Sequence, residues 1–276
     1  MRIAEVLSQR SSEQEILLAH ILKRQTIDLY KDHQRIITPE QYCRFRKLLR
    51  KYNRGWPAAY LTGHKEFMSL DFVVTPDVLI PRPETELLVE EAIKSVEHRA
   101  RSVEKMLIVL DIGTGSGNIA ISIAKHCGIK NLRIIASDIS EKALDVARLN
   151  VKQHQVSKYI KLCSGDLFKP FKGIKADMIV SNPPYVDRAE KSKWQAGLRY
   201  EPAGALWAGK KGLAYIEKII KHAPDYLKPE GFLLLEIGIG QAKVALQIIK
   251  ATNVFRAIKI FDDYNGIPRI LSANRC

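Results

Sequence analysis

Short apolar runs recur along the second half of the chain, and a glycine-rich or polar turn follows each of them. Four runs with the length of a buried strand come first, at residues 107–111, 133–137, 159–163 and 176–181. The segment 118–126 has the spacing of a helix instead, with Ile119, Ala120 and Ile123 on one side. This alternation of strand and helix patterns predicts an α/β fold built on a mostly parallel sheet. Further helices are predicted at 213–227 and 241–251, and further strands at 232–237, 255–261 and 267–273.

Residues 1 to about 80 have a different pattern, which predicts a separate helical module. Ser12 with Glu15, and Thr38 with Gln41, have the spacing of capping boxes that open helices. In the second of these helices the apolar positions recur at helical spacing, so their first role is core packing. These positions are Tyr42, Phe45, Leu49 and Tyr52.

The boundary between the two parts is predicted from the change of pattern. Residues 67–74 alternate loosely like strand material, 84–97 have helical spacing, and the charged stretch 98–105 separates them from the first buried strand. We therefore expect an N-terminal helical domain at 1–80, a connecting segment and helix at 81–105, and the domain that holds the sheet at 106–276.

A glycine-rich loop, Gly113-Thr114-Gly115-Ser116-Gly117, joins the first of these strands to the helix after it. Glycines let a backbone take positive φ and approach a ligand closely, and a strand, glycine turn and helix open nucleotide-binding βαβ units. The spacing is G-x-G-x-G, without the G-x-G-x-x-G pattern that seats a pyrophosphate on a helix N-terminus. Asp111, just before the loop, suits a ligand that carries an ammonium and a sulfonium. The loop therefore favours S-adenosylmethionine over NAD.

Acidic side chains end the next two predicted strands. Asp138 follows the second strand, where a carboxylate can accept hydrogen bonds from both hydroxyls of a ribose. Asp166 and Leu167 follow the third strand and are placed for the amino group and the face of an adenine. Because the carboxyl ends of parallel strands meet at one edge, these residues are expected to line one site with the glycine loop. The alternative is that Asp138 and Asp166 are only turn residues at strand ends.

The fourth strand ends in Asn182-Pro183-Pro184-Tyr185. Two prolines lock φ and supply no amide hydrogens, so this backbone can only accept hydrogen bonds. Asn182 adds a side-chain oxygen acceptor. A site rich in fixed acceptors suits a planar amino group, either an amide NH₂ or the exocyclic amine of a base.

Composition limits the class of protein. The chain has 276 residues, of which 46% are hydrophobic, and carries a formal net charge of +14. No apolar run approaches the ~18 residues of a membrane span. The acidic residues near the N-terminus argue against a targeting segment. The four cysteines are scattered without a C-x-x-C pair, which favours free thiols and a cytoplasmic location. The seven histidines are dispersed, and no metal site is predicted.

Together these features resemble the class I S-adenosylmethionine-dependent methyltransferases that act on amino groups, and within that class the HemK/PrmC family. Six motifs occur in the order found in that family: YLTG at 60–63, LIPRPETE at 79–86, DIGTGSG at 111–117, NPPY at 182–185, RYEP at 199–202 and GFLLLE at 231–236. The resemblance implies a Rossmann-like, seven-stranded sheet with an antiparallel last strand and a small N-terminal helical domain that recognises the substrate. It also implies methyl transfer to the side-chain amide nitrogen of the glutamine in the Gly-Gly-Gln motif of peptide chain release factors.

The roles that this resemblance implies can be given residue by residue. The Asn182 side-chain oxygen and the Pro183 carbonyl would accept the two amide hydrogens, and Tyr185 would pack against the amide plane and exclude water. Residues 81–85 would close one wall of the site, and no residue is expected to act as a general base. The predicted catalytic residues are Asn182, Pro183 and Tyr185, and the predicted substrate-binding residues are Asn182, Pro183, Pro184 and Tyr185. The predicted cofactor-binding residues are Gly113, Thr114, Gly115, Ser116, Gly117, Asp138, Asp166, Leu167 and Asn182.

The partners are less narrowly defined. Between Gln41 and Lys65 the sequence has many lysines and arginines and no acidic residue. Such a surface could follow phosphates or an acidic protein, or could simply be solvated. We expect a monomer whose substrate is a release factor and which does not bind a membrane. Direct nucleic-acid binding is possible but not required. Two alternatives stay open: a glutamine methyltransferase for a ribosomal protein, and a methyltransferase for exocyclic amines of nucleic acids.

Overall fold

The computed structural model describes residues 1–7, 11–101, 105–187, 189 and 196–276, and this part of the chain forms two compact units. The smaller unit contains residues 1–64 and the short helix Ala196–Tyr200, and the larger unit contains most of the chain from Lys65 onward. The division falls after residue 64, earlier than the predicted boundary near residue 80. The reason is that strand β2 (Leu70–Val73) packs against helix α8 (Glu141–Gln153) of the larger unit.

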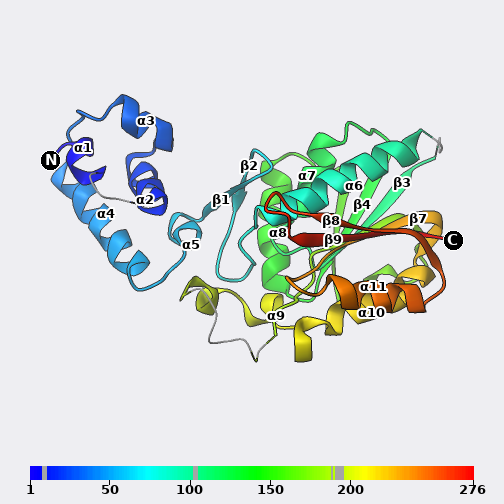
Figure 1. Cartoon of the computed structure of the whole chain (residues 1–276). Helices are drawn as coiled ribbons and strands as arrows, with labels where there is room; N and C mark the ends of the chain where they lie inside the picture. Colours follow the sequence, from blue (N-terminus) through cyan, green and yellow to red (C-terminus); the bar gives the residue numbers. More distant parts are fainter. Residues whose placement is uncertain (8–10, 102–104, 188, 190–195) are drawn as a thin grey trace. The chain divides into compact units, whose positions relative to one another are not determined.

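The smaller unit is helical, as predicted, and has its own hydrophobic core. Its helices are α1 (Ile3–Leu7), α2 (Ser12–Leu22), α3 (Thr26–Lys31), α4 (Pro39–Tyr52) and α5 (Ala58–Thr62) (Figure 1). Phe45 and Leu49 of α4 are buried in this core, and Tyr42 and Tyr52 pack against it. The segment Ala196–Tyr200 joins this unit through Tyr200, whose hydroxyl donates to the carbonyl of Arg54 at 3.1 Å.

One of the two predicted capping boxes is present. At the start of α4 the Gln41 amide nitrogen donates to Thr38 Oγ1 at 3.2 Å, and the Thr38 amide nitrogen donates to Gln41 Oε1 at 3.1 Å. The box predicted from Ser12 and Glu15 is wrong. Helix α2 starts at Ser12 with Ser11 at the N-cap, so Ser12 lies inside the helix and Glu15 is one position too late.

The larger unit is built on a seven-stranded sheet with the order β5-β4-β3-β6-β7-β9-β8. Its strands are β3 (Leu107–Ile112), β4 (Leu132–Asp138), β5 (Ile160–Ser164), β6 (Ala176–Ser181), β7 (Leu227–Glu236), β8 (Phe255–Asp262) and β9 (Pro268–Arg275). The first five are parallel, and β9 runs antiparallel between β7 and β8. β1 (His64–Phe67) and β2 form a separate two-stranded sheet. The predicted fold class is confirmed.

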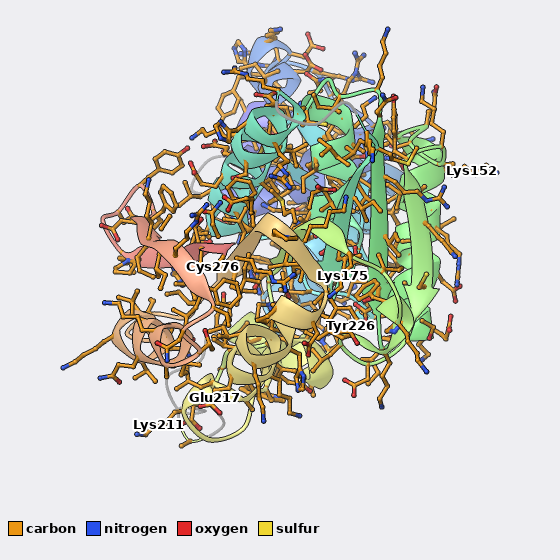
Figure 2. All side chains as sticks on the ribbon, turned by 90° about the vertical axis from the view of Figure 1, so that its right-hand side faces the viewer. Lys152, Lys175, Lys211, Glu217, Tyr226 and Cys276 are labelled. Carbon is orange, nitrogen blue, oxygen red and sulfur yellow. The ribbon has the colours of Figure 1, made fainter. Side chains whose placement is uncertain are left out.

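Helices cover both faces of the sheet (Figure 1). Helices α6 (Glu84–Ala100) and α7 (Asn118–His126) contribute to one buried cluster, and α10 (Ala214–His222) and α11 (Ala242–Ala251) contribute to the other. Side chains fill the space between the helices and the strands (Figure 2). This double cover explains why β3 and β6 are almost continuously apolar instead of alternating.

The strand order places several chain turns at one edge of the sheet. From β3 the chain moves through β4 to β5 on one side and then returns to β6 on the other side of β3. The strands β3, β4, β5 and β6 therefore end at the same edge, at the point where the strand order reverses. In open α/β sheets this is the place where ligands bind.

The structure also bears on the state of the cysteines, on metal binding and on membrane spans. All four cysteines are free thiols, and Cys276 is exposed at the end of the chain (Figure 2). Among the described residues there is no group of three or more side chains that could hold a metal ion. None of the helices in the described part of the chain has both the length and the apolar character needed to cross a membrane.

Candidate active site

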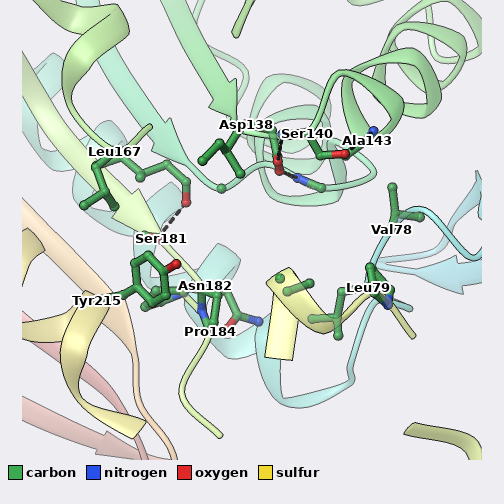
Figure 3. A pocket seen from close by; sticks show the side chains of 18 of the residues that line it. Val78, Leu79, Asp138, Ser140, Ala143, Leu167, Ser181, Asn182, Pro184 and Tyr215 are labelled. Atoms are coloured by element: carbon green, nitrogen blue, oxygen red, sulfur yellow. Dashed lines mark hydrogen bonds between the residues drawn. The ribbon is translucent and has the colours of Figure 1, made fainter. Parts of the chain in front are cut away.

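A cavity of about 280 Å³ lies at this edge of the sheet, entirely within the larger unit (Figure 3). The predicted site residues that line it are Gly113, Gly115, Asp138, Asp166, Leu167, Asn182, Pro183 and Pro184. In the close-up, Asp138 and Leu167 lie on one side of the cavity and Asn182 and Pro184 on the other. The structure therefore brings together residues from the ends of four strands, as the sequence predicted.

The glycine loop forms one wall. Gly113 and Gly115 have φ values of +75° and +55°, in the left-handed region that favours glycine. A Cβ at either position would meet no protein atom within 4 Å, so the loop leaves open space in front of its backbone. Gly117 has a packing role, because its Cβ would lie 3.0 Å from the Ile121 side chain. Gly117 does not line the cavity.

Thr114 and Ser116 are buried behind the loop and do not line the cavity either. The Thr114 hydroxyl donates to Asp111 Oδ2 at 2.6 Å, which ties the loop to the end of β3. Burial of Asp111 raises the pKa of its carboxyl to about 7, and the hydrogen bond from Thr114 partly offsets this. The second oxygen, Asp111 Oδ1, is buried without a hydrogen-bond partner in the described part of the chain. Thr114 and Ser116 thus support the loop instead of forming its surface.

Asp138 closes the end of β4 and lines the cavity. Its Oδ2 accepts the amide of Gly115 at 2.9 Å, and its Oδ1 accepts the amide of Ser140 at 2.9 Å. Burial raises the pKa of this carboxyl, and the backbone donors act in the opposite direction. A carboxylate has about four acceptor positions. The two backbone donors therefore leave capacity for the hydroxyls of a ribose.

Asp166 and Leu167 follow β5 and lie at the rim. Asp166 is partly exposed and pairs with Lys169, with 3.5 Å between Oδ2 and Nζ. Leu167 has a positive φ of 48°, which is unusual for a residue other than glycine. Both residues line the cavity, and Leu167 provides an apolar surface there.

The turn after β6 forms the opposite wall. Ser181 anchors it, because its hydroxyl donates to the carbonyl of Ile112 at 2.6 Å. The next residue, Asn182, donates from Nδ2 to Thr85 Oγ1 at 3.0 Å. This bond uses the donor end of the amide and leaves Oδ1 as an acceptor at the cavity. The carbonyl of Pro183 accepts no hydrogen bond from the described backbone.

The structure places Tyr185 differently from the prediction. Its side chain does not line the cavity; its hydroxyl donates to Glu236 Oε1 at 3.0 Å, and its ring belongs to the hydrophobic cluster around α10 and α11. The carbonyl of Tyr185 accepts from Gln241 Nε2 at 3.0 Å, which fixes the end of the turn. The aromatic residue that does line the cavity is Tyr215 of α10 (Figure 3). Only a helix was predicted over this segment, and the helical spacing that Tyr215 shares with Ile219 is equally typical of core packing.

Residues 81–85, which were expected to close one wall of the site, do not line the cavity. Residues 77–79, which precede them in the chain, form this wall. Asp77, Val78 and Leu79 line the cavity, and so does a segment that includes part of helix α9 (Ala203–Leu206). Glu201 joins the two segments: it accepts the amide of Ile80 at 3.2 Å and forms an ion pair with Arg82. Residues 81–85 therefore support this wall without lining the cavity. No sequence pattern indicated that 77–79 and 203–206 would line the same cavity.

These observations fit S-adenosylmethionine. The open backbone at Gly113 and Gly115 can accept a close ligand, the free capacity of Asp138 suits ribose hydroxyls, and Leu167 offers an apolar surface for an adenine. The buried carboxyl of Asp111 lies behind the same loop, and its charged form would favour a positively charged ligand.

Comparison with known proteins identifies the families to which this chain is similar. Residues 3–63 match the family described as PrmC N-terminal domain, and residues 85–198 match the family described as Methyltransferase small domain. A release factor glutamine methyltransferase of Geobacter sulfurreducens is 38% identical over 260 residues, which cover 94% of this chain and 87% of that protein. One from Rhodopirellula baltica is 38% identical over 263 residues, which cover 95% of this chain and 88% of that protein.

Among solved structures, the N-terminal domain of human METTL16 in complex with SAH is similar to this chain. The TM-score is 0.52 at 17% sequence identity, over 75% of this chain and 76% of that one. At this identity the likeness concerns the fold only.

Proposed function

Because the chain belongs to the release factor glutamine methyltransferase family, we propose that it methylates the side-chain amide nitrogen of the glutamine in the Gly-Gly-Gln motif of peptide chain release factors. The cofactor is S-adenosylmethionine, which is supported by the methyltransferase family and by the residues that line the cavity. The observation that carries the proposal is the arrangement of acceptors at the turn after β6. The Asn182 amide is held by Thr85 so that Oδ1 is left for a ligand, and Pro183, the next residue, also lines the cavity.

These two acceptors match the two hydrogens of a primary amide. S-adenosylmethionine would supply a methyl group and leave as S-adenosylhomocysteine, and the proton displaced from the amide nitrogen would pass to water. The amide nitrogen is a poor nucleophile because its lone pair is delocalised into the carbonyl. Asn182 Oδ1 and the Pro183 carbonyl would each accept one amide hydrogen, which holds the nitrogen in one orientation. They would also stabilise the positive charge that develops on the nitrogen. Orientation and electrostatic stabilisation of this kind supply several kcal/mol of a barrier.

The residues that we propose to hold the cofactor lie in the wall opposite the turn after β6. The backbone at Gly113 and Gly115 would hold its methionine part, Asp138 the ribose, and Asp166 with Leu167 the adenine. Asn182 lines the same cavity from the turn after β6 and would contact both ligands. Thr114, Ser116 and Gly117 would act indirectly by shaping the loop.

The smaller unit is proposed to recognise the release factor. The exposed face of α4 has a run of cations that includes Arg46, Lys47 and Lys51, and none of these three forms an ion pair within the described part of the chain. Such a face would attract an acidic protein surface and speed association. We place the reaction in the cytoplasm, where translation terminates, and propose that the enzyme works as a monomer.

Reversal of this charge tests the proposed role of α4. Changing Arg46, Lys47 and Lys51 to Glu leaves the buried Phe45 and Leu49 in place, so the unit should still fold. We expect kcat/KM for a release factor to fall by about tenfold or more at low salt through slower association, and the loss to shrink as salt rises. Steady-state kinetics over a salt series measures this.

A matched variant controls for net charge. Lys125, Lys221 and Lys250 are exposed in the larger unit, and changing these three to Glu alters the net charge by the same amount. This control should keep kcat/KM close to that of the unchanged protein. Equal losses in both triple variants would mean that α4 has no specific role. Collapse of RNA binding in the α4 variant alone, with unchanged methylation of the release factor, would assign the face to nucleic acid.

The substrate itself is tested with labelled S-adenosylmethionine. We expect label in a release factor, none in the same factor with the Gly-Gly-Gln glutamine changed to alanine, and none in RNA or ribosomal proteins. Label in a ribosomal protein alone would favour the related activity on that substrate. Label in nucleic acid alone would overturn the proposal in favour of an exocyclic-amine methyltransferase.

A further inference from the structure

A fully buried carboxylate lies behind the Asn-Pro-Pro-Tyr turn. Glu236 is the last residue of β7 and has no exposed surface. Burial of an isolated carboxylate is costly, so a buried glutamate needs hydrogen-bond donors. The hydroxyl of Tyr185 is one of them, donating to Oε1 at 3.0 Å. Burial and the neighbouring carboxylate raise the pKa of Tyr185, so the phenol keeps its proton and stays a donor.

Thr85 is the second group that acts on Glu236. It is the second residue of α6, is buried, and lies beside the same carboxylate, near enough to lower its pKa by hydrogen bonding. No donor reaches Glu236 Oε2 at full hydrogen-bonding geometry in the described part of the chain. Thr85 also accepts the bond from Asn182 Nδ2 at 3.0 Å. A hydroxyl has one hydrogen to donate, so a threonine that accepts from Asn182 keeps its own hydrogen for the carboxylate.

A hydrogen bond from Thr85 to Glu236 would complete a chain across three elements, from Glu236 on β7 through Thr85 on α6 to Asn182 after β6. At the far end of such a chain the amide of Asn182 keeps Nδ2 toward Thr85 and Oδ1 toward the cavity. The opposite orientation would set the amide oxygen against the Thr85 oxygen. That hydroxyl would then have to turn its hydrogen away from the buried carboxylate.

We propose that Glu236 and Thr85 are positioning residues for methyl transfer, which fix the Asn182 amide with its oxygen toward the substrate and increase the negative charge on that oxygen. Tyr185 has the same kind of role, as the second group that holds the carboxylate in place. This inference rests on the proposed function, in which Asn182 accepts a hydrogen of the substrate amide. Hydrogen bonds in a chain strengthen one another in a buried environment, so the Glu236 carboxylate would polarise the Asn182 amide through Thr85.

The protonation state of Glu236 decides whether the chain is intact. Burial raises the pKa of Glu236 to about 7, while Thr85, Tyr185 and Arg269 act to lower it. The charged groups around it are Arg269 on β9 and Glu84 on α6, and Arg82 acts on the adjoining Tyr185. Below this pKa the protonated carboxyl no longer accepts from both hydroxyls. We therefore expect kcat to rise with pH through about 7.

The first test uses a matched pair at Thr85. Thr85→Val keeps the shape and removes the hydroxyl, and Thr85→Ser keeps the hydroxyl. We expect Thr85→Val to lower kcat by roughly 10- to 100-fold, the range for loss of a buried hydrogen bond to a charged group, with KM for the release factor and cofactor affinity within a few-fold. Thr85→Ser should restore kcat to within about threefold. Thermal unfolding of both variants measures any loss of stability separately.

The second test uses Glu236→Gln and the pH profile of kcat. Asp111 also has a pKa of about 7, so the profile of the unchanged protein alone does not identify the group. Comparison with Glu236→Gln does, because the variant should be slower and should lose the rise that belongs to Glu236. A profile that is identical in shape in the two proteins would contradict the inference. So would a Thr85→Val variant that is as active as Thr85→Ser.

The outcomes separate this inference from the proposed function. If Asn182→Ala is inactive but Thr85→Val and Glu236→Gln are fully active, Asn182 is catalytic and the positioning inference fails. If Asn182→Ala itself keeps normal activity, the proposed function of the turn fails. Should Thr85→Val not fold, Thr85→Ser and the pH profiles of Glu236→Gln still decide the question.

Discussion

Replacing Asn182 with alanine is expected to lower kcat for methylation of a release factor by roughly 100- to 1,000-fold, the range for loss of one group that stabilises charge in a transition state. Asn182 lines the cavity and offers Oδ1 to the substrate amide, because its Nδ2 is held by Thr85. Without that acceptor the amide nitrogen loses both its orientation and the stabilisation of its developing charge. Cofactor affinity should change by only a few-fold, since most of the proposed cofactor contacts come from the ends of β3, β4 and β5.

Single-turnover kinetics and calorimetry with S-adenosylhomocysteine measure the two effects separately. Asn131→Ala is a matched control: Asn131 is an exposed asparagine just before β4, at the edge of the sheet opposite the cavity. It should behave like the unchanged protein. Near-normal turnover by Asn182→Ala would remove the proposed mechanism. A large loss of cofactor affinity together with activity would instead make Asn182 mainly a cofactor-binding residue.

The elements that the sequence predicted well are those whose apolar pattern is set by burial alone. Helix α7 and strand β6 have the predicted bounds, because each is a short apolar segment between strong turn signals. The predicted helix 213–227 was too long. Helix α10 ends at His222, and Pro224 lies in the short 3₁₀ turn after it, since proline lacks the amide hydrogen that a continuing α-helix needs. The chain then enters β7 at Leu227, earlier than the predicted residue 232.

The candidate site was predictable wherever a strand end carried an unusual side chain. Asp138 and Asn182 were identified because topology brings strand ends together. Strand ends and apolar spacing did not show that Tyr215 lines the cavity and that Tyr185 does not. Apolar spacing shows that a side chain is buried, but not whether it faces a cavity or a core. Whether an aromatic residue lines the cavity therefore became visible only in the structure.

Contacts between distant segments were also outside the reach of the sequence. Thr85 supports Asn182 across 97 residues, and Glu201 contacts Ile80 across 121. The motifs that contain these residues were recognised by resemblance, but the pattern alone did not show why a threonine or a glutamate is needed. The physical reason is that buried polar groups require partners, and in both cases the partner lies on another element.

Replacing Asp138 with alanine is expected to weaken cofactor binding by about 1.5–3 kcal/mol, or roughly 10- to 100-fold in Kd, the range for hydrogen bonds to a charged group. Asp138 lines the cavity and its carboxylate keeps acceptor capacity beyond the amides of Gly115 and Ser140. The same change leaves those two amides without a partner, so part of the loss could come from a looser loop. Thermal unfolding without ligand measures that part, and calorimetry with S-adenosylhomocysteine measures the total.

Asp145→Ala removes the same charge from the exposed side of α8 and should leave Kd unchanged, because Asp145 pairs only with Arg148 on that helix among the described residues. Unchanged affinity in Asp138→Ala would mean that Asp138 is a turn residue and that the ribose is held elsewhere. A loss of affinity larger than the loss of stability would show that the carboxylate contacts the ligand directly.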